Sequence, residues 1–182
     1  MPPKPETYIS VDIEASGPIP GEFSLLSIGA CTVGKTNQTF YAELKPINSN
    51  FIKRALEVNG LSLAKLKNGG EKPAQAMARF EQWVKTVSQN TRPVFVGFNT
   101  TFDWSFIHWY FIKFLGRNPF GISGLDIKAY FMGKHQVAWH GTIKKKVRAL
   151  YPPQTAHTHN ALDDAKEQAE IFTQMISSKD SG

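Results

Sequence analysis

The sequence contains a single cysteine and no long apolar run, and each absence excludes a class of protein. With Cys31 as the one cysteine among 182 residues, a disulfide framework and a cysteine-based zinc cluster are excluded. Lys113 interrupts the most apolar stretch, residues 109–115, so no segment approaches the roughly 18 apolar residues that a membrane span needs. No signal-peptide pattern follows the polar start at residues 1–6. We therefore expect a soluble protein of the reducing cytoplasm.

Repeats, low-complexity tracts and linkers are also missing from the sequence, which indicates one folded domain. Hydrophobic residues make up 41% of the chain and aromatic residues 12%, and these values exclude a disordered or collagen-like protein. We expect a mobile leader at residues 1–6, a single domain at 7–176 and a mobile tail at 177–182.

Positive charge exceeds negative charge in this chain. Lys and Arg number 21 against 15 Asp and Glu, which gives a net charge of +6. Such an excess favours a polyanionic partner such as nucleic acid, because neutralising phosphate is the commonest use of a basic surface. A solvated surface that happens to be basic explains the same number, so charge alone leaves both interpretations open.

Hydrophobic periodicity predicts alternating strands and helices. The expected strands span residues 8–13, 25–33, 38–44, 93–98 and 124–127. The expected helices span residues 51–58, 62–67, 73–87, 102–115, 142–150 and 160–176. Turn residues at 34–37 join the second and third strands into a hairpin. A meander followed by alternating strands and helices predicts an α/β domain, in which helices cover both faces of a central five-stranded mixed sheet.

Two carboxylates stand at the end of the first expected strand. Asp12 and Glu14 are two residues apart, so their side chains point to the same face of the strand. Two like charges held side by side favour a cation between them, and hard divalent ions prefer oxygen ligands. An exposed strand end with two solvated acids is the simpler alternative for this pair taken alone.

Two further elements carry acids at the starts of expected helices. Asp103 falls in the first turn of the helix that follows the fourth strand, where open α/β sheets bind their ligands. His159 precedes the last helix, and Asp164 lies within its first two turns. Each acid also suits the positive end of a helix dipole, so neither element alone indicates a site.

Taken in this order, the three elements resemble the DEDDh family of 3′→5′ exonucleases, the DnaQ-like superfamily typified by the proofreading subunit of bacterial DNA polymerase III. The family's Asp-x-Glu motif stands at Asp12 and Glu14, its middle aspartate at Asp103, and its His-x4-Asp motif at His159 and Asp164. The resemblance covers nearly the whole chain. It implies a ribonuclease H-like exonuclease fold and a metal-dependent 3′→5′ exonuclease activity on nucleic acid.

Within this family the chain looks most like the ribonuclease T branch, through residues 98–106 and 116–120. Phe98 stands where many members have histidine, and we interpret that position as structural. The resemblance to this branch implies single-stranded 3′ ends as substrates, with RNA slightly ahead of DNA, and allows a homodimer.

The resemblance also implies a mechanism. Two divalent metal ions, Mg²⁺ or Mn²⁺, would lie about 3.5–4 Å apart for an in-line displacement. The implied metal ligands are Asp12, Glu14, Asp103 and Asp164. His159 would take the proton of the attacking water, and nucleoside 5′-monophosphates would leave from the 3′ end. The family spacing selects Asp164 over its neighbour, so we interpret Asp163 as a helix-terminus charge.

Six further positions are expected to contact the substrate: Ala15, Ser16, Phe23, Leu26, Asn99 and Phe102. The resemblance implies that the backbone N–H groups of Ala15 and Ser16 hold the 3′-terminal nucleotide. Phe102 precedes a motif residue and is expected to contact the terminal base, and Phe23 and Leu26 would supply a wedge that stacks under it. Core packing explains Leu26 at least as well.

Four further features allow more than one interpretation. The basic helix from Lys144 to Arg148 is either a solvated face or a contact for the phosphate backbone. His157 and His159 form a His-x-His pair, but the missing cysteine partner and the nearby carboxylates disfavour zinc. Asp126 is expected to cap the next helix. A non-catalytic nucleic-acid or partner-binding domain of the same fold is the alternative to an enzyme, although all five motif side chains are present.

Overall fold

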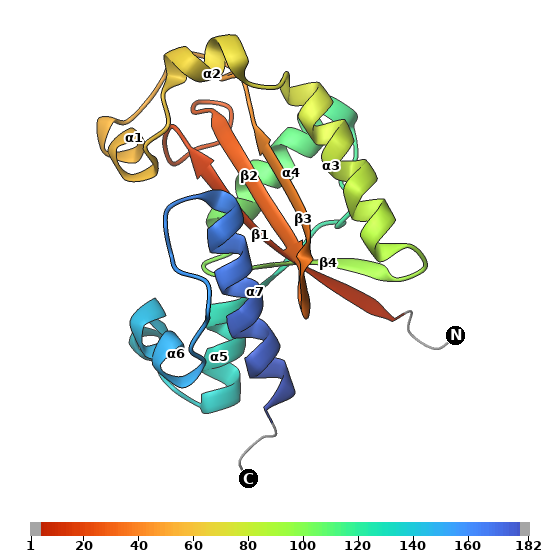
Figure 1. Cartoon of the computed structure of the whole chain (residues 1–182), viewed down its shortest axis with the longest axis vertical. Helices are drawn as coiled ribbons and strands as arrows, with labels where there is room; N and C mark the ends of the chain where they lie inside the picture. Colours follow the sequence, from red (N-terminus) through yellow and green to blue (C-terminus); the bar gives the residue numbers. More distant parts are fainter. Residues whose placement is uncertain (1–4, 179–182) are drawn as a thin grey trace.

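The computed structural model describes residues 5–178 and contains one five-stranded sheet (Figure 1). Its strands are β1 (Glu6–Ala15), β2 (Leu25–Thr32), β3 (Lys35–Glu43), β4 (Arg92–Gly97) and β5 (Gly124–Asp126). The order across the sheet is β3-β2-β1-β4-β5. The pairs β1–β2 and β2–β3 are antiparallel, whereas β1–β4 and β4–β5 are parallel. The predicted five-stranded mixed sheet is therefore confirmed.

The boundaries differ from the prediction in three places. Glu6 pairs with Arg92 in parallel register, so this part of the expected leader belongs to the sheet. The hairpin turn predicted at residues 34–37 is shorter, since β3 already begins at Lys35. Ser177, placed in the tail, is the last residue of the final helix. The other positions predicted to be mobile include residues 1–4 and 179–182, which lie outside the described residues.

The helices are α1 (Lys53–Asn59), α2 (Leu63–Gly69), α3 (Pro73–Ser88), α4 (Thr101–Leu115), α5 (Ile127–His135), the 3-10 helix η1 (Trp139–Thr142), α6 (Lys144–Leu150) and α7 (Ala161–Ser177). Periodicity did not predict α5 as a separate helix. Its predicted cap is confirmed, because Asp126 Oδ1 accepts the N–H of Ala129 at 2.8 Å. Among residues 5–178 no helix is both long and apolar enough to span a membrane.

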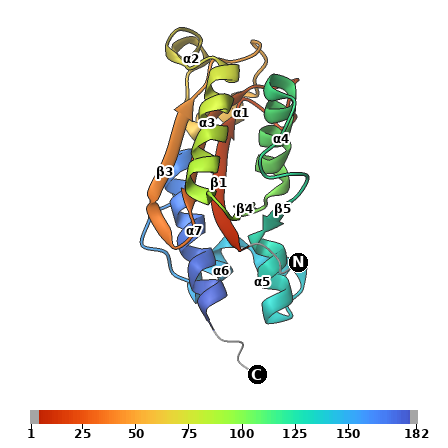
Figure 2. The same cartoon turned by 90° about the vertical axis from the view of Figure 1, so that its right-hand side faces the viewer.

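Helices cover both faces of the sheet (Figures 1 and 2). On one face α3 and α4 pack against β1, where Ile9, Val11 and Ile13 are buried together with Phe80 and Phe106. On the other face α7 crosses β1 and β2, and α5 and α6 complete a second core beside it. Because side chains alternate along a strand, the polar positions of β1 face α7.

Small residues bring α7 unusually close to the sheet. A Cβ atom added at Gly29 of β2 would lie 2.1 Å from the backbone of Ala161, so only glycine fits there. Ala161, Ala165 and Ala169 are fully buried along the inner face of α7. Gly29 is also the register partner of Asp12 on β1. The first turn of α7 is therefore held directly over Asp12.

Candidate active site

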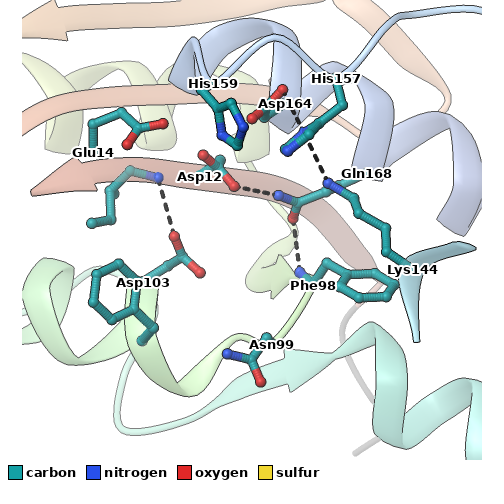
Figure 3. A pocket seen from close by; sticks show the side chains of 12 residues that line it. Asp12, Glu14, Phe98, Asn99, Asp103, Lys144, His157, His159, Asp164 and Gln168 are labelled. Carbon is teal, nitrogen blue, oxygen red and sulfur yellow. Dashed lines mark hydrogen bonds and ion pairs between the residues drawn. The ribbon is translucent and has the colours of Figure 1, made fainter. Parts of the chain in front are cut away.

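The carboxyl end of β1 presents two acids on the face that α7 covers (Figure 3). Asp12 and Glu14 alternate with the buried residues Val11 and Ile13. Asp103 reaches them from the first turn of α4, since α4 follows β4 and β4 runs parallel to β1. The N–H of Ile13 donates to Asp103 Oδ1 at 3.1 Å, and Asp103 is only 5% exposed. Two segments far apart in sequence thus meet at one end of the sheet.

The start of α7 supplies the fourth acid. Asn160 caps the helix, because its Oδ1 accepts the N–H of Leu162 at 3.0 Å. Asp164 is 2% exposed, and its Oδ1 accepts the N–H of Thr158 at 2.9 Å. The neighbouring Asp163 accepts the hydroxyl of Thr158 at 3.0 Å instead, and it does not line the pocket. The structure therefore places Asp164, and not Asp163, with the other acids.

These side chains converge on one pocket of about 220 Å³. Carboxylate oxygens of Asp12, Glu14 and Asp164 lie within 4.8 Å of one another. Asp103 and His159 line the same pocket, so the structure brings all five motif residues together (Figure 3). The other lining residues are Ile13, Phe98, Asn99, Phe102, Lys144, His157 and Gln168.

Burial, together with neighbouring charges, favours the protonated forms of three of these acids. Burial, together with the charges of the neighbouring acids, raises the pKa of Asp12 well above its usual range. Burial, followed by the charges of Asp164 and Asp103, raises the pKa of Glu14 to about 8. Burial also raises the pKa of Asp103. Burial therefore makes the ionised forms of Asp12, Glu14 and Asp103 costly unless a cation binds, and this all-oxygen set of donors fits a hard divalent ion.

Gln168 was missed by the sequence analysis. Its Nε2 donates to Asp12 Oδ1 at 2.5 Å, and its Oε1 accepts the N–H of Phe98 at 2.8 Å (Figure 3). One amide thus fixes the rotamer of Asp12 and ties α7 to the end of β4. The available signal was the helical spacing, because residue 168 lies four positions after Asp164 and shares its face.

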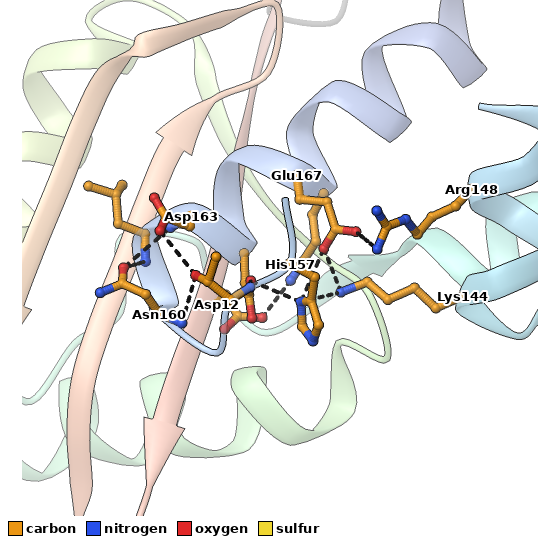
Figure 4. A network of polar contacts seen from close by, with 11 residues as sticks. Asp12, Lys144, Arg148, His157, Asn160, Asp163 and Glu167 are labelled. Atoms are coloured by element: carbon orange, nitrogen blue, oxygen red, sulfur yellow. Dashed lines mark hydrogen bonds and ion pairs between the residues drawn. The ribbon is translucent and has the colours of Figure 1, made fainter. Parts of the chain in front are cut away.

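Behind the pocket, an ion network joins α6 to α7 (Figure 4). Glu167 is fully buried, with its Oε2 2.7 Å from Lys144 Nζ and its Oε1 3.1 Å from an Arg148 guanidinium nitrogen. His157 Nδ1 lies 2.9 Å from Asp164 Oδ1 and 3.2 Å from Glu167 Oε2. The solvated-face interpretation is therefore wrong for Lys144 and Arg148, since both are ion-paired to a buried carboxylate.

The histidine pair also lies at the site. Side-chain nitrogen and oxygen atoms of His157, His159 and Asp164 lie within 4.8 Å of one another. The centres of the two imidazole rings are 4.5 Å apart. His159 is exposed and has a left-handed backbone, with φ of 58°. This conformation turns the chain just before α7, so both rings face the acidic pocket (Figure 3).

A second hollow of about 390 Å³ adjoins the pocket at Glu14 and Phe102. Its other lining residues are Ala15, Gly17, Pro18, Ile52, Arg54, Ala55, Val58 and Asn59. Phe102 is 37% exposed and borders both cavities, while Asn99 borders the acidic pocket. Three of the six expected substrate positions, Ala15, Asn99 and Phe102, thus border the two cavities.

Two of the other three positions do not fit their expected contacts. Leu26 is fully buried within β2, so it has no surface to stack on a base. The N–H of Ser16 already donates to the carbonyl of Ser24 at 2.9 Å, so this amide is not free for a nucleotide. Phe23 is partly exposed and packs on Gly17, where an added Cβ would lie 2.3 Å from the ring.

Comparison with known proteins agrees with this geometry. The family described as exonuclease, of the RNase T type, matches residues 9–172. The chain belongs to the RNase T exonuclease family. A curated relative from Escherichia coli, the 3′-5′ DNA exonuclease Cap18, is 48% identical over 168 residues, which cover 92% of this chain and 90% of the relative. Together these findings identify a 3′→5′ exonuclease, a hydrolase that acts on nucleic acid.

Solved structures of exonucleases share the fold at low sequence identity. The nuclease domain of 3′hExo, a DEDDh family member bound to rAMP, matches with a TM-score of 0.73 and 15% identity, over 93% of this chain and 91% of that chain. Exonuclease I from E. coli, in complex with a dT13 oligonucleotide, matches with a TM-score of 0.74 and 14% identity, over 94% of this chain and 41% of that chain. The predicted ribonuclease H-like exonuclease fold is thus confirmed for this RNase T exonuclease.

Proposed function

We propose that this RNase T exonuclease removes nucleotides one at a time from the 3′ end of single-stranded DNA. The observation that carries the proposal is the convergence of four carboxylates and His159 on one open pocket. The named activity of the 48% identical relative supports DNA as the substrate. An adjoining hollow with many apolar lining residues suits the sugar and base of a terminal nucleotide.

The RNA preference expected from the sequence has weaker support. It rested on the resemblance to the ribonuclease T branch, chiefly on residues 116–120, and none of these five lines the pocket or the adjoining hollow. Arg117 pairs with Glu81 at 2.7 Å, and Phe120 is buried in the core. These residues support the fold, so we place DNA ahead of RNA and leave RNA as an outcome of the test. The homodimer and the cytoplasmic location stay predictions.

The acids are proposed to hold the metal. Asp12, Glu14 and Asp164 lie close enough to share an ion, and Asp103 lies beside them. The family resemblance implies two ions, Mg²⁺ or Mn²⁺. Bound divalent cations would neutralise the phosphodiester and lower the pKa of the attacking water. Gln168 keeps Asp12 in one orientation through a 2.5 Å hydrogen bond, so the pocket is ordered before substrate binds.

His159 is proposed as the general base. It is exposed and lines the pocket, and imidazole is the side chain that most often acts as a general base. The attacking water gives its proton to His159 and forms a bond to phosphorus. The bond from phosphorus to the 3′ oxygen of the penultimate nucleotide breaks, and that oxygen takes up a proton. The products are a nucleoside 5′-monophosphate and a strand one nucleotide shorter.

The test compares one sequence as single-stranded DNA, single-stranded RNA and blunt duplex, each with a label, in Mg²⁺ or Mn²⁺. We expect stepwise shortening from the 3′ end, fastest on single-stranded DNA, and no reaction with the Asp12→Asn variant or in excess chelator. A faster reaction on RNA would reverse the substrate order only. Binding without any cleavage would favour the non-catalytic domain, and cleavage from the 5′ end would refute the proposal.

A further inference from the structure

Lys144 is the one residue lining the acidic pocket that carries a permanent positive charge, within the described residues 5–178. The pocket otherwise presents carboxylates, imidazoles, amides and apolar groups. The Lys144 side chain is 26% exposed, and its ammonium lies 5.7 Å from the centre of the Phe98 ring. Figure 3 shows it extending along the wall opposite Glu14. A cation on this wall contacts a nucleic-acid strand that leaves the pocket on the side opposite Glu14.

The ion network fixes Lys144 without neutralising it. Glu167 is fully buried, and it offers one oxygen to Lys144 at 2.7 Å and the other to Arg148 at 3.1 Å. Two cations therefore share one carboxylate, which leaves a surplus of one positive charge beside the pocket. An ammonium has three donors. Glu167 lies 2.7 Å and His157 Nδ1 3.1 Å from Lys144 Nζ, so these two contacts leave one donor for a further anion.

The direction of the strand follows from the two cavities. The hollow beyond Glu14 and Phe102 takes the terminal nucleotide under the proposed function, and the cluster at Asp12 faces the scissile phosphate. Lys144 lies on the opposite side of Asp12 from Glu14, which borders that hollow (Figure 3). The strand that runs away from the scissile bond therefore passes Lys144.

We propose that Lys144, held by Glu167, binds the phosphate on the 5′ side of the penultimate nucleotide and so fixes the strand from which the terminal nucleotide is cut. This inference rests on the proposed function, because it needs a single strand in the pocket. A charge-assisted hydrogen bond to a phosphate is stronger than one between neutral groups. Losing it should lower kcat/KM about 10- to 100-fold and should reduce the slope of log kcat/KM against log salt by about 0.7.

The experiment pairs protein variants with a modified substrate. Wild type, Lys144→Ala and Lys144→Arg are assayed on single-stranded DNA that carries either natural phosphates or one neutral methylphosphonate at the contacted position. Lys145→Ala is the matched control, since Lys145 is the adjacent residue of α6 and is exposed. Thermal melts of each variant show whether it folds, and Lys144→Arg keeps the charge if the alanine variant does not fold.

We expect Lys144→Ala and the methylphosphonate each to lower kcat/KM about 10-fold or more, with little further loss when they are combined. Lys144→Arg should retain most activity, and Lys145→Ala should stay within about 2-fold of wild type. Fully additive losses would overturn the proposal, since Lys144 would then act only by anchoring α6. Wild type without cleavage on any substrate would refute the proposed function instead, so the two failures are distinguishable.

Discussion

Removing the charge of Glu14 should stabilise the metal-free protein at alkaline pH. Burial and neighbouring acids raise the pKa of Glu14 from 4.5 to about 8. Between these two values the unfolded chain has released this proton and the folded chain still holds it. The unfolded state binds fewer protons, so the free energy of unfolding falls as pH rises through this window. Glu14→Gln has no such proton to lose and keeps a polar side chain of similar shape.

The magnitude follows from the size of the pKa shift. A rise from 4.5 to about 8 corresponds to about 5 kcal/mol if Glu14 titrates alone. Burial is the largest cause of this shift, followed by the charges of Asp164 and Asp103, and because these groups titrate together we expect one substitution to recover only part of it, about 2 kcal/mol. For a chain of this length, 1 kcal/mol shifts Tm by roughly 2–4 °C. We therefore expect the variant to melt about 4–8 °C higher than wild type at pH 8.5 in EDTA.

The measurement is thermal and urea unfolding in EDTA from pH 5 to pH 8.5. The difference between Glu14→Gln and wild type should be small at pH 5 and should grow with pH. Mn²⁺ should raise the Tm of wild type more than that of the variant, because the variant lacks one carboxylate ligand. Glu22→Gln is the control, since Glu22 is exposed and lies outside the pocket. A Glu14→Gln variant that melts at or below wild type at pH 8.5 would contradict the expected cost of ionising Glu14 in the folded protein.

Three further substitutions test the site. His159→Ala should slow cleavage by about 10²–10⁴-fold, and calorimetry should show Mn²⁺ binding little changed. A loss of Mn²⁺ binding would place His159 among the metal ligands instead. Gln168→Leu leaves Asp12 without its donor and should lower kcat or Mn²⁺ affinity about 10- to 100-fold, whereas unchanged kinetics would remove its positioning role. Gly29→Ala forces α7 away from the sheet, so it should destabilise the fold by about 1–3 kcal/mol and reduce cleavage. Gly133→Ala is the control: a Cβ atom there meets open space, so neither stability nor cleavage should change.

The positions of the acids could be predicted because local rules decide them. Asp12 and Glu14 share a face through the alternation of strand side chains, and Asp103 opens the helix after β4. The choice of Asp164 over Asp163 needed the family spacing, because both acids lie in the first turn of α7. The fold was predictable for a related reason. Three successive strands followed by alternating strands and helices are compatible with only a few sheet topologies.

The supporting contacts could not be predicted, because they depend on tertiary distances. Gln168 reaches Asp12 across 156 positions of sequence, and a lone glutamine in a helix carries no motif. The pairing of Glu167 with Lys144 depends on how α6 packs beside α7, which no local pattern fixes. Leu26 was placed in the site because it follows the first motif, but it faces the interior, since every residue of β2 is buried between two helical layers.

Helix α7 explains why these separate contacts act together. Asp164, Glu167 and Gln168 stand at i, i+3 and i+4, so one face of the helix carries all three. Asp164 faces the proposed metal site. Glu167 holds Lys144 from outside the pocket, and Gln168 holds Asp12 in place. The close contact at Gly29 sets the height of this face over the sheet. Rotation or sliding of α7 would therefore misplace the acid, the cation and the orienting amide at once, so we expect substitutions at this helix–sheet contact to reduce cleavage before they abolish folding.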